Sequence, residues 1–130
     1  MYAMDLENLE VYVLARGLSD KAWEIYRRWN QEAKHLWGQQ FLEAVDSIGA
    51  NIAEGFGRYH YADKNKFNLN ARGSLVEARH WVDLCLSRRS ISADEHQKFC
   101  DGLNRLGIKL NNYITATRKL SGAKSRRVSA

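Results

Sequence analysis

The run FLEAVDSIGANIAEGFG, residues 41–57, decides the fold class, because its apolar side chains recur at the spacing of an α-helix. Steps of four, three and four residues place one set of side chains on a single helix face: Phe41, Val45, Ile48 and Ile52. The run ends at Gly55 and Gly57, and glycine readily adopts the left-handed backbone that ends many helices. The run therefore predicts an amphipathic helix over about 39–57 that ends in a left-handed glycine.

Three further segments carry the same spacing, over about 6–30, from near Asp63 to Cys85, and from Ser92 onward. The last segment has a clear start, because Ser92 and Glu95 form the pattern of a capping box. Proline is absent, and no stretch alternates polar and apolar residues as a strand does. Joined by short connections, these segments predict an all-α fold, an antiparallel up-down-up-down four-helix bundle over residues 1–120.

Length and composition fit one globular domain. The chain has 130 residues, of which 45% are hydrophobic and 27% charged, and this balance excludes wholesale disorder. The longest apolar run, Val11–Ala15, is far shorter than the roughly 20 residues of a membrane span, and the acidic start does not resemble a signal peptide. We therefore expect a cytoplasmic protein, in which Cys85 and Cys100 are reduced core residues.

The net charge of +5 is concentrated at the C-terminus. Residues 118–130 contain five basic residues and no acidic one: Arg118, Lys119, Lys124, Arg126 and Arg127. From Ser121 onward the chain has little apolar surface to offset the entropy of ordering it, so residues 121–130 are predicted to form a disordered, flexible basic tail. Such a tail could contact RNA or DNA, or it could serve only to keep the protein soluble.

The predicted topology places the turn between the second and third helices beside the chain ends. Residues 58–67 interleave cations with aromatic rings there, a mixture that suits phosphates and unpaired bases. Alternatively, the aromatic rings close the end of the bundle and the lysines are solvated. The candidate nucleic-acid-binding residues are Arg58, Lys64, Lys66, Arg118, Lys119, Lys124, Arg126 and Arg127.

Metal and catalytic patterns are weak in this sequence. Glu32 and His35 fall in the first connection, and His80 lies about 140° from the centre of the apolar stripe on its helix, so neither Glu-x-x-His pair suits a di-iron centre. Neither cysteine has an evident base beside it, and no phosphate-binding loop is present. We therefore predict no catalytic residue, no metal ligand and no cofactor.

The second and third predicted helices each carry a polar flank beside the apolar stripe. The flank of the second helix contains Asn51, Glu54 and Arg58, and that of the third contains Gly73 and Glu77. An ion pair between Glu54 and Arg58 explains part of this pattern. We also expect the flanks to meet a neighbouring helix, in the same bundle or in another subunit, which makes self-association a prediction.

The runs SIGANIAEGFGR (47–58) and ARGSLVE (71–77) resemble the signature of the four-helix bundle proteins encoded in intervening sequences of bacterial 23S rRNA genes. The resemblance implies a left-handed bundle that assembles as a homopentamer and has no enzymatic activity. The family also includes the accessory variability protein of diversity-generating retroelements, so the resemblance implies nucleic acid and a reverse transcriptase as partners. The signature residues are Asn51, Glu54, Gly55, Gly57, Arg58, Gly73, Ser74 and Glu77.

The chain departs from the family pattern on its second helix. Residues 40–43 replace a basic pair, and Gly49 stands where the family usually has proline. A nucleic-acid role would therefore depend on Arg58, the following turn and the tail. The sequence predicts a non-enzymatic oligomeric module that accompanies nucleic acid or a ribonucleoprotein, with a protein-interaction scaffold as the alternative.

Overall fold

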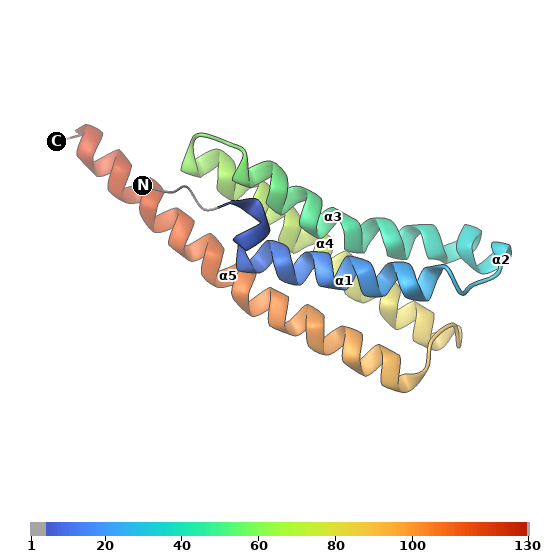
Figure 1. The fold of residues 1–130 in the computed structure, drawn as a ribbon. Coiled ribbons are helices and arrows are strands. Elements are labelled where there is room, and N and C mark those ends of the chain that lie inside the picture. Colours follow the sequence, from blue (N-terminus) through green and yellow to red (C-terminus); the bar gives the residue numbers. More distant parts are fainter. Residues whose placement is uncertain (1–4, 130) are drawn as a thin grey trace.

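Four long antiparallel helices form the protein in a computed structural model that describes residues 5–129, with side chains as far as Gly122 (Figure 1). The helices are α1 (Glu10–Tyr26), α3 (Gln39–Phe56), α4 (Tyr61–Ser87) and α5 (Ala93–Ser129). A 3₁₀ turn, η1 (Leu6–Asn8), precedes α1. The predicted all-α four-helix bundle is confirmed.

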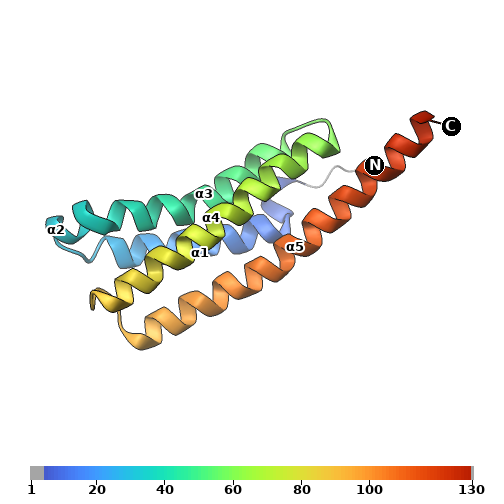
Figure 2. The same ribbon diagram turned by 180° about the vertical axis from the view of Figure 1, so that it is seen from behind.

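The helices close into a ring in which each one contacts two neighbours. α1 packs on α3, α3 on α4, α4 on α5, and α5 on α1. The α3–α4 turn and η1 lie at one end of the bundle, and the α4–α5 turn lies at the other (Figures 1 and 2). The C-terminal part of α5 continues beyond the first end.

The core lies along the axis of this ring. The predicted stripe of α3 is fully buried, since Phe41, Val45, Ile48 and Ile52 have 0% exposure. The aromatic ring of Phe41 packs against α5, where its centroid lies 5.4 Å from that of Phe99. Burying each such side chain stabilises the fold by about 1.5–3 kcal/mol, so this face fixes the orientation of α3.

The connection between α1 and α3 is more helical than the sequence predicts. α1 ends at Tyr26 instead of continuing to residue 30, and the short helix α2 (Gln31–Ala33) and a π-helical turn (Lys34–Gly38) lead directly into α3. Asn30 caps this segment, because its Oδ1 accepts a hydrogen bond of 2.9 Å from the backbone N–H of Ala33. A Cβ on Gly38 would lie 3.1 Å from the rings of both Tyr26 and Trp29, so any other residue here would push against both rings.

The end of α3 differs from the prediction of a left-handed glycine. Gly57 has φ −76°, and no described glycine has a positive φ. The last carbonyls of the helix are satisfied in other ways. The N–H of Gly57 donates to the carbonyl of Ala53 (3.2 Å), and Lys64 Nζ donates to the carbonyl of Phe56 (2.9 Å). A left-handed residue is therefore not needed here.

The predicted capping box at the start of α5 is confirmed. The N–H of Glu95 donates to Ser92 Oγ, and the N–H of Ser92 donates to Glu95 Oε1, both at 3.1 Å. Arg28 also donates to Glu95 Oε2 (2.6 Å), so the end of α1 is tied to the start of α5.

The α5 helix runs to Ser129, past the boundary at residue 120 where the sequence predicts a flexible tail. No proline interrupts it, and its lysines and arginines favour a helix C-terminus, whose partial charge is negative. The side chains of Lys124, Arg126 and Arg127 lie outside the described residues. Neither α5 nor any other described helix has a stretch that is both long and apolar enough to cross a bilayer.

Candidate nucleic-acid interface

A groove between the start of α4 and the far part of α5 brings together two separated candidate residues. Lys66 comes from the first turns of α4, and Arg118 comes from α5. We call this feature the α4–α5 groove. It is lined by Tyr61, Ala62, Asn65, Lys66, Leu69, Asn70, Arg118 and Ser121.

Asn65 joins the two helices of this groove, and Asn68 bonds to Asn65 from within α4. Asn65 Nδ2 donates to the carbonyl of Ile114 on α5 (2.9 Å), and its Oδ1 accepts from Asn68 Nδ2 (3.0 Å). Asn68 is 1% exposed, and its Oδ1 is buried without a hydrogen-bond partner. This bridge lies one helical turn before Arg118 and fixes where α5 passes α4.

Neither asparagine is among the site residues that the sequence predicts. Asn68 is in phase with the buried residues of α4, which step by three and four: Asn68, Ala71, Leu75, Ala78, Val82 and Cys85. A polar residue at the head of an apolar stripe is the signal that points to it, because buried amides are normally hydrogen-bonded.

Arg58 lies at the α3–α4 turn and is held by two neighbours. Its Nη2 donates to Glu54 Oε1 (2.6 Å), so the expected ion pair is present. Its guanidinium carbon is 4.7 Å from the ring centroid of Phe67, which is a cation–π distance. Arg58 therefore joins α3 to α4 and does not line the groove.

Lys64 points into the turn. Its Nζ, besides its hydrogen bond to Phe56, lies 5.6 Å from the centroid of the Phe56 ring. Burial lowers the pKa of this amine. The structure thus places Lys64 as a cap on α3, turned away from the groove that Lys66 lines.

The remaining candidate cations lie on α5. Lys119 is exposed next to Arg118.

The lining of the α4–α5 groove includes the aromatic ring of Tyr61 and no carboxylate. By contrast, the groove between α1 and α5 mixes Asp20 and Glu24 with Lys21. The α4–α5 groove therefore presents positive charge, amides and a ring without an opposing acid.

The signature residues divide into a packed part and an exposed part. A Cβ on Gly55 would lie 2.9 Å from the carbonyl oxygen of Lys64, so this glycine permits the close approach of α3 and α4. Gly73, in contrast, has no atom within 4 Å of its Cβ position. Ser74 is half-buried and Glu77 exposed.

The polar flank makes only local hydrogen bonds in the described chain. Asn51 Nδ2 donates to the carbonyl of Ser47 (2.9 Å), and Trp81 Nε1 donates to Glu77 Oε1 (3.4 Å). Like the pair of Glu54 and Arg58, each of these bonds joins residues only four positions apart in the chain. Among the described helices, therefore, the predicted polar network between the flank and a neighbouring helix is not seen.

The prediction that neither cysteine has a base beside it is wrong for Cys100. Cys100 Sγ lies 3.5 Å from His96 Nε2, one turn earlier on α5, so a base does stand beside it. The spacing of four residues between histidine and cysteine was the available signal. Burial raises the pKa of Cys100, and it raises that of Cys85 to about 12, so both thiols are neutral at pH 7.

Comparison with known proteins agrees with the fold. A solved structure from Bacteroides thetaiotaomicron, a protein of unknown function from the S23 ribosomal protein family, has a TM-score of 0.75 and 20% sequence identity. The match covers 80% of this chain and 97% of that one, and at this identity it shows the fold alone. No curated protein matches the chain. A sequence model described as 23S rRNA-intervening sequence protein matches residues 7–112, which include both signature runs and end before Arg118. The chain therefore belongs to the 23S rRNA-intervening sequence protein family.

Proposed function

We propose that this protein is a non-enzymatic, homo-oligomeric accessory module that binds nucleic acid in the α4–α5 groove. The observation that carries the proposal is the meeting of Lys66 and Arg118, from different helices, in a groove without a carboxylate. Two cations on opposite walls can contact successive phosphates of one strand. Tyr61 offers a ring on which an unpaired base can stack.

Assembly would make these few contacts effective. A single groove offers only two described cations, which is a weak electrostatic site. Several grooves on one oligomer raise the effective concentration of each for a long strand, so modest contacts combine into useful affinity. Lys119, which is exposed next to Arg118, would add to the positive charge of α5.

The outer face of α4 supports self-association. Leu69 and Val76 are 38% and 64% exposed, and Gly73 lies between them at helical spacing with open space above it. An exposed stripe of apolar and small residues suits close packing against a helix of a second copy. The homopentamer implied by the family resemblance is the assembly that we propose.

The test is a fluorescence-anisotropy titration of a structured RNA and a single-stranded DNA at two salt concentrations. We compare the full chain with the double variant Lys66→Gln/Arg118→Gln. The matched control, Lys21→Gln/Lys98→Gln, removes the same charge from the lining of the α1–α5 groove. Losing two phosphate contacts should flatten the plot of log affinity against log salt by about 1.4–1.8, whereas the control should keep the original slope.

Two results would count against this function. Equal loss in both double variants would mean that overall charge, and not the groove, attracts nucleic acid. Absence of binding by the full chain at low salt would reject the nucleic-acid role and leave the protein-interaction scaffold.

A further inference from the structure

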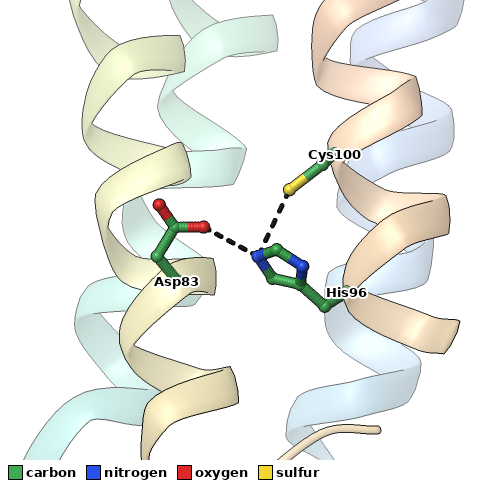
Figure 3. Close-up of side chains that lie close together, drawn as sticks. All are labelled: Asp83, His96 and Cys100. Atoms are coloured by element: carbon green, nitrogen blue, oxygen red, sulfur yellow. Dashed lines mark hydrogen bonds and ion pairs between the residues drawn. The ribbon is translucent and has the colours of Figure 1, made fainter. Parts of the chain in front are cut away.

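A cluster of three side chains lies at the opposite end of the bundle from the α4–α5 groove. Asp83 comes from α4, and His96 and Cys100 come from the first turns of α5 (Figure 3). We call these residues the Asp–His–Cys cluster. Their ligand atoms all lie within 4.8 Å of one another.

The carboxylate and the thiol point at the same ring nitrogen. His96 Nε2 is 2.7 Å from Asp83 Oδ1 and 3.5 Å from Cys100 Sγ, as the two dashed lines in Figure 3 show. A nitrogen that donates its proton to Asp83 cannot also accept one from the thiol. When this nitrogen carries the proton, the Cys100 thiol therefore cannot donate to it. A cation between the three atoms, in contrast, would contact all of them.

The donor types and spacing suit zinc. Imidazole nitrogen, thiolate sulfur and carboxylate oxygen are its usual protein ligands. With Zn–N and Zn–S bonds of about 2.0 and 2.3 Å, a tetrahedral site separates nitrogen from sulfur by roughly 3.5 Å. The observed separation of 3.5 Å between His96 Nε2 and Cys100 Sγ already matches that value.

Only the carboxylate has to move. Its oxygen must move away from the ring nitrogen by about 0.7 Å, and it must also come to roughly 3.5 Å from the Cys100 sulfur, to reach tetrahedral spacing. The three ligand atoms now lie within 4.8 Å of one another. The Asp83 side chain is 58% exposed, so solvent leaves room for this movement. His96 is half-buried and Cys100 is 8% exposed, so the helix holds the other two donors in place.

The surrounding charges do not forbid a cation. Arg79 acts on the Cys100 sulfur from α4, and its guanidinium donates to Asn104. Asp83 and Asp101 oppose it with negative charge near the same sulfur. One arginine therefore faces two carboxylates and, once the metal has displaced the thiol proton, a thiolate.

We propose that Asp83, His96 and Cys100 bind one zinc ion, with water as the fourth ligand. Three protein ligands and one solvent-facing position form a common zinc arrangement. The ion would join α4 to α5 just before and after the turn that connects them. The thiol proton leaves to solvent as the Zn–S bond forms, so no redox partner is needed.

Cobalt substitution tests the sulfur ligand directly. The purified full chain, stripped with chelator, is titrated with Co²⁺ and followed by absorption spectroscopy. We expect one Co²⁺ per chain, a thiolate-to-cobalt charge-transfer band, and loss of the spectrum when Zn²⁺ is added. Cys100→Ser should lose the band, and Cys85→Ser, which removes the other buried cysteine, should keep it.

Zinc affinity measured by competition with a chromophoric chelator tests the other two ligands. Asp83→Asn and His96→Gln should each weaken binding by at least about 10-fold, because even residues outside the first shell commonly contribute that much. Asp101→Asn and His80→Gln are the matched controls and should bind zinc as the unaltered chain does. Asp83 is exposed, so its variant should fold even if Cys100→Ser perturbs the core.

The proposal is overturned if the unaltered chain shows no thiolate band, or if that band survives in Cys100→Ser. It is equally overturned if Asp83→Asn binds zinc as tightly as the unaltered chain. In that case the cluster is a hydrogen-bonded pair of Asp83 and His96 with a thiol beside it.

Discussion

Gly55 shows how one missing side chain sets the spacing of two helices. The nearest atoms to its Cβ position belong to α4, namely the Lys64 carbonyl oxygen at 2.9 Å and Phe67 Cβ at 3.0 Å. A backbone oxygen within a helix cannot move aside cheaply. Gly57, two residues later, has no neighbour closer than 3.6 Å and a φ that any residue adopts.

These two glycines give a matched pair of substitutions. Gly55→Ala should cost about 1–2 kcal/mol net, because overpacking costs up to about 3 kcal/mol and alanine returns roughly 1 kcal/mol of helix propensity. Gly57→Ala should change the stability by less than about 0.5 kcal/mol. Urea unfolding followed by circular dichroism measures both. Equal effects at the two positions would contradict this account of the α3–α4 contact.

At the residue scale, the sequence predicted which residue types lie at the site better than it predicted where their side chains point. Lys64 and Lys66 looked equivalent in a basic turn, yet Lys64 caps α3 and Lys66 lines the α4–α5 groove. Their separation of two residues turns them to different sides of α4, and the long lysine stem decides which carbonyl is reached. The Asp–His–Cys cluster was missed for a related reason, since the register of α4 against α5 does not follow from spacing within either helix.

The position at which α5 begins is fixed largely by local sequence. Burial of the Glu95 carboxylate opposes its ionisation, but the Ser92 N–H and the Arg28 guanidinium outweigh it and lower its pKa. A carboxylate whose folded pKa lies below its unfolded one stabilises the fold above the unfolded pKa. That contribution is lost as the pH falls through the folded value.

Removal of this charge should therefore have an effect that depends on pH. Glu95→Gln should lower stability by a few tenths to about 1 kcal/mol at pH 7, since the pair with Arg28 is partly exposed. The difference from the unaltered chain should shrink below about pH 4. Thermal unfolding at several pH values measures it, with the exposed Asp94→Asn in the same turn as control. A difference that stays constant from pH 7 to pH 3 would contradict the assigned contacts.

At the element scale, periodicity predicted which segments are helices, whereas local caps and tertiary contacts set where the helices begin and end. The apolar stripe of α3 was predicted correctly because four buried residues share one face. The helical segment that starts at Gln31 is capped by Asn30, and Tyr26 and Trp29 pack close to Gly38 at its far end; periodicity encodes neither contact. Beyond residue 120 the low apolar content predicts a flexible tail, whereas helix propensity and the absence of proline favour the helix that continues to Ser129.

At the scale of the whole molecule, the arrangement of helices explains why part of the site was predictable. An up-down-up-down ring brings the α3–α4 turn and the far part of α5 to one end, so topology alone placed Lys66 near Arg118. The asparagine bridge that sets their exact relation was not predictable, because it depends on the crossing of α4 and α5.

Assembly is a property of the whole molecule that one substitution can test. Val76→Glu places a carboxylate on a side chain that is 64% exposed, so the single chain should fold normally. Within a packed interface the same carboxylate would be buried without a partner, which strongly disfavours association. We expect light scattering to show a multiple of 15.0 kDa for the unaltered chain and a smaller mass for the variant, with equal helicity. The same mass for both proteins would exclude the α4 stripe from the interface.

The closed ring of helices also determines how the entropy of chain closure is distributed. Three of its four contacts join helices that follow one another along the chain. Short connections bring such partners together at little entropic cost, and contacts of this kind are typical of fast-folding domains. Among these four contacts, only that between α1 and α5 spans most of the sequence. The large entropic cost of closing a long loop is therefore confined to the interface between the first and last long helices.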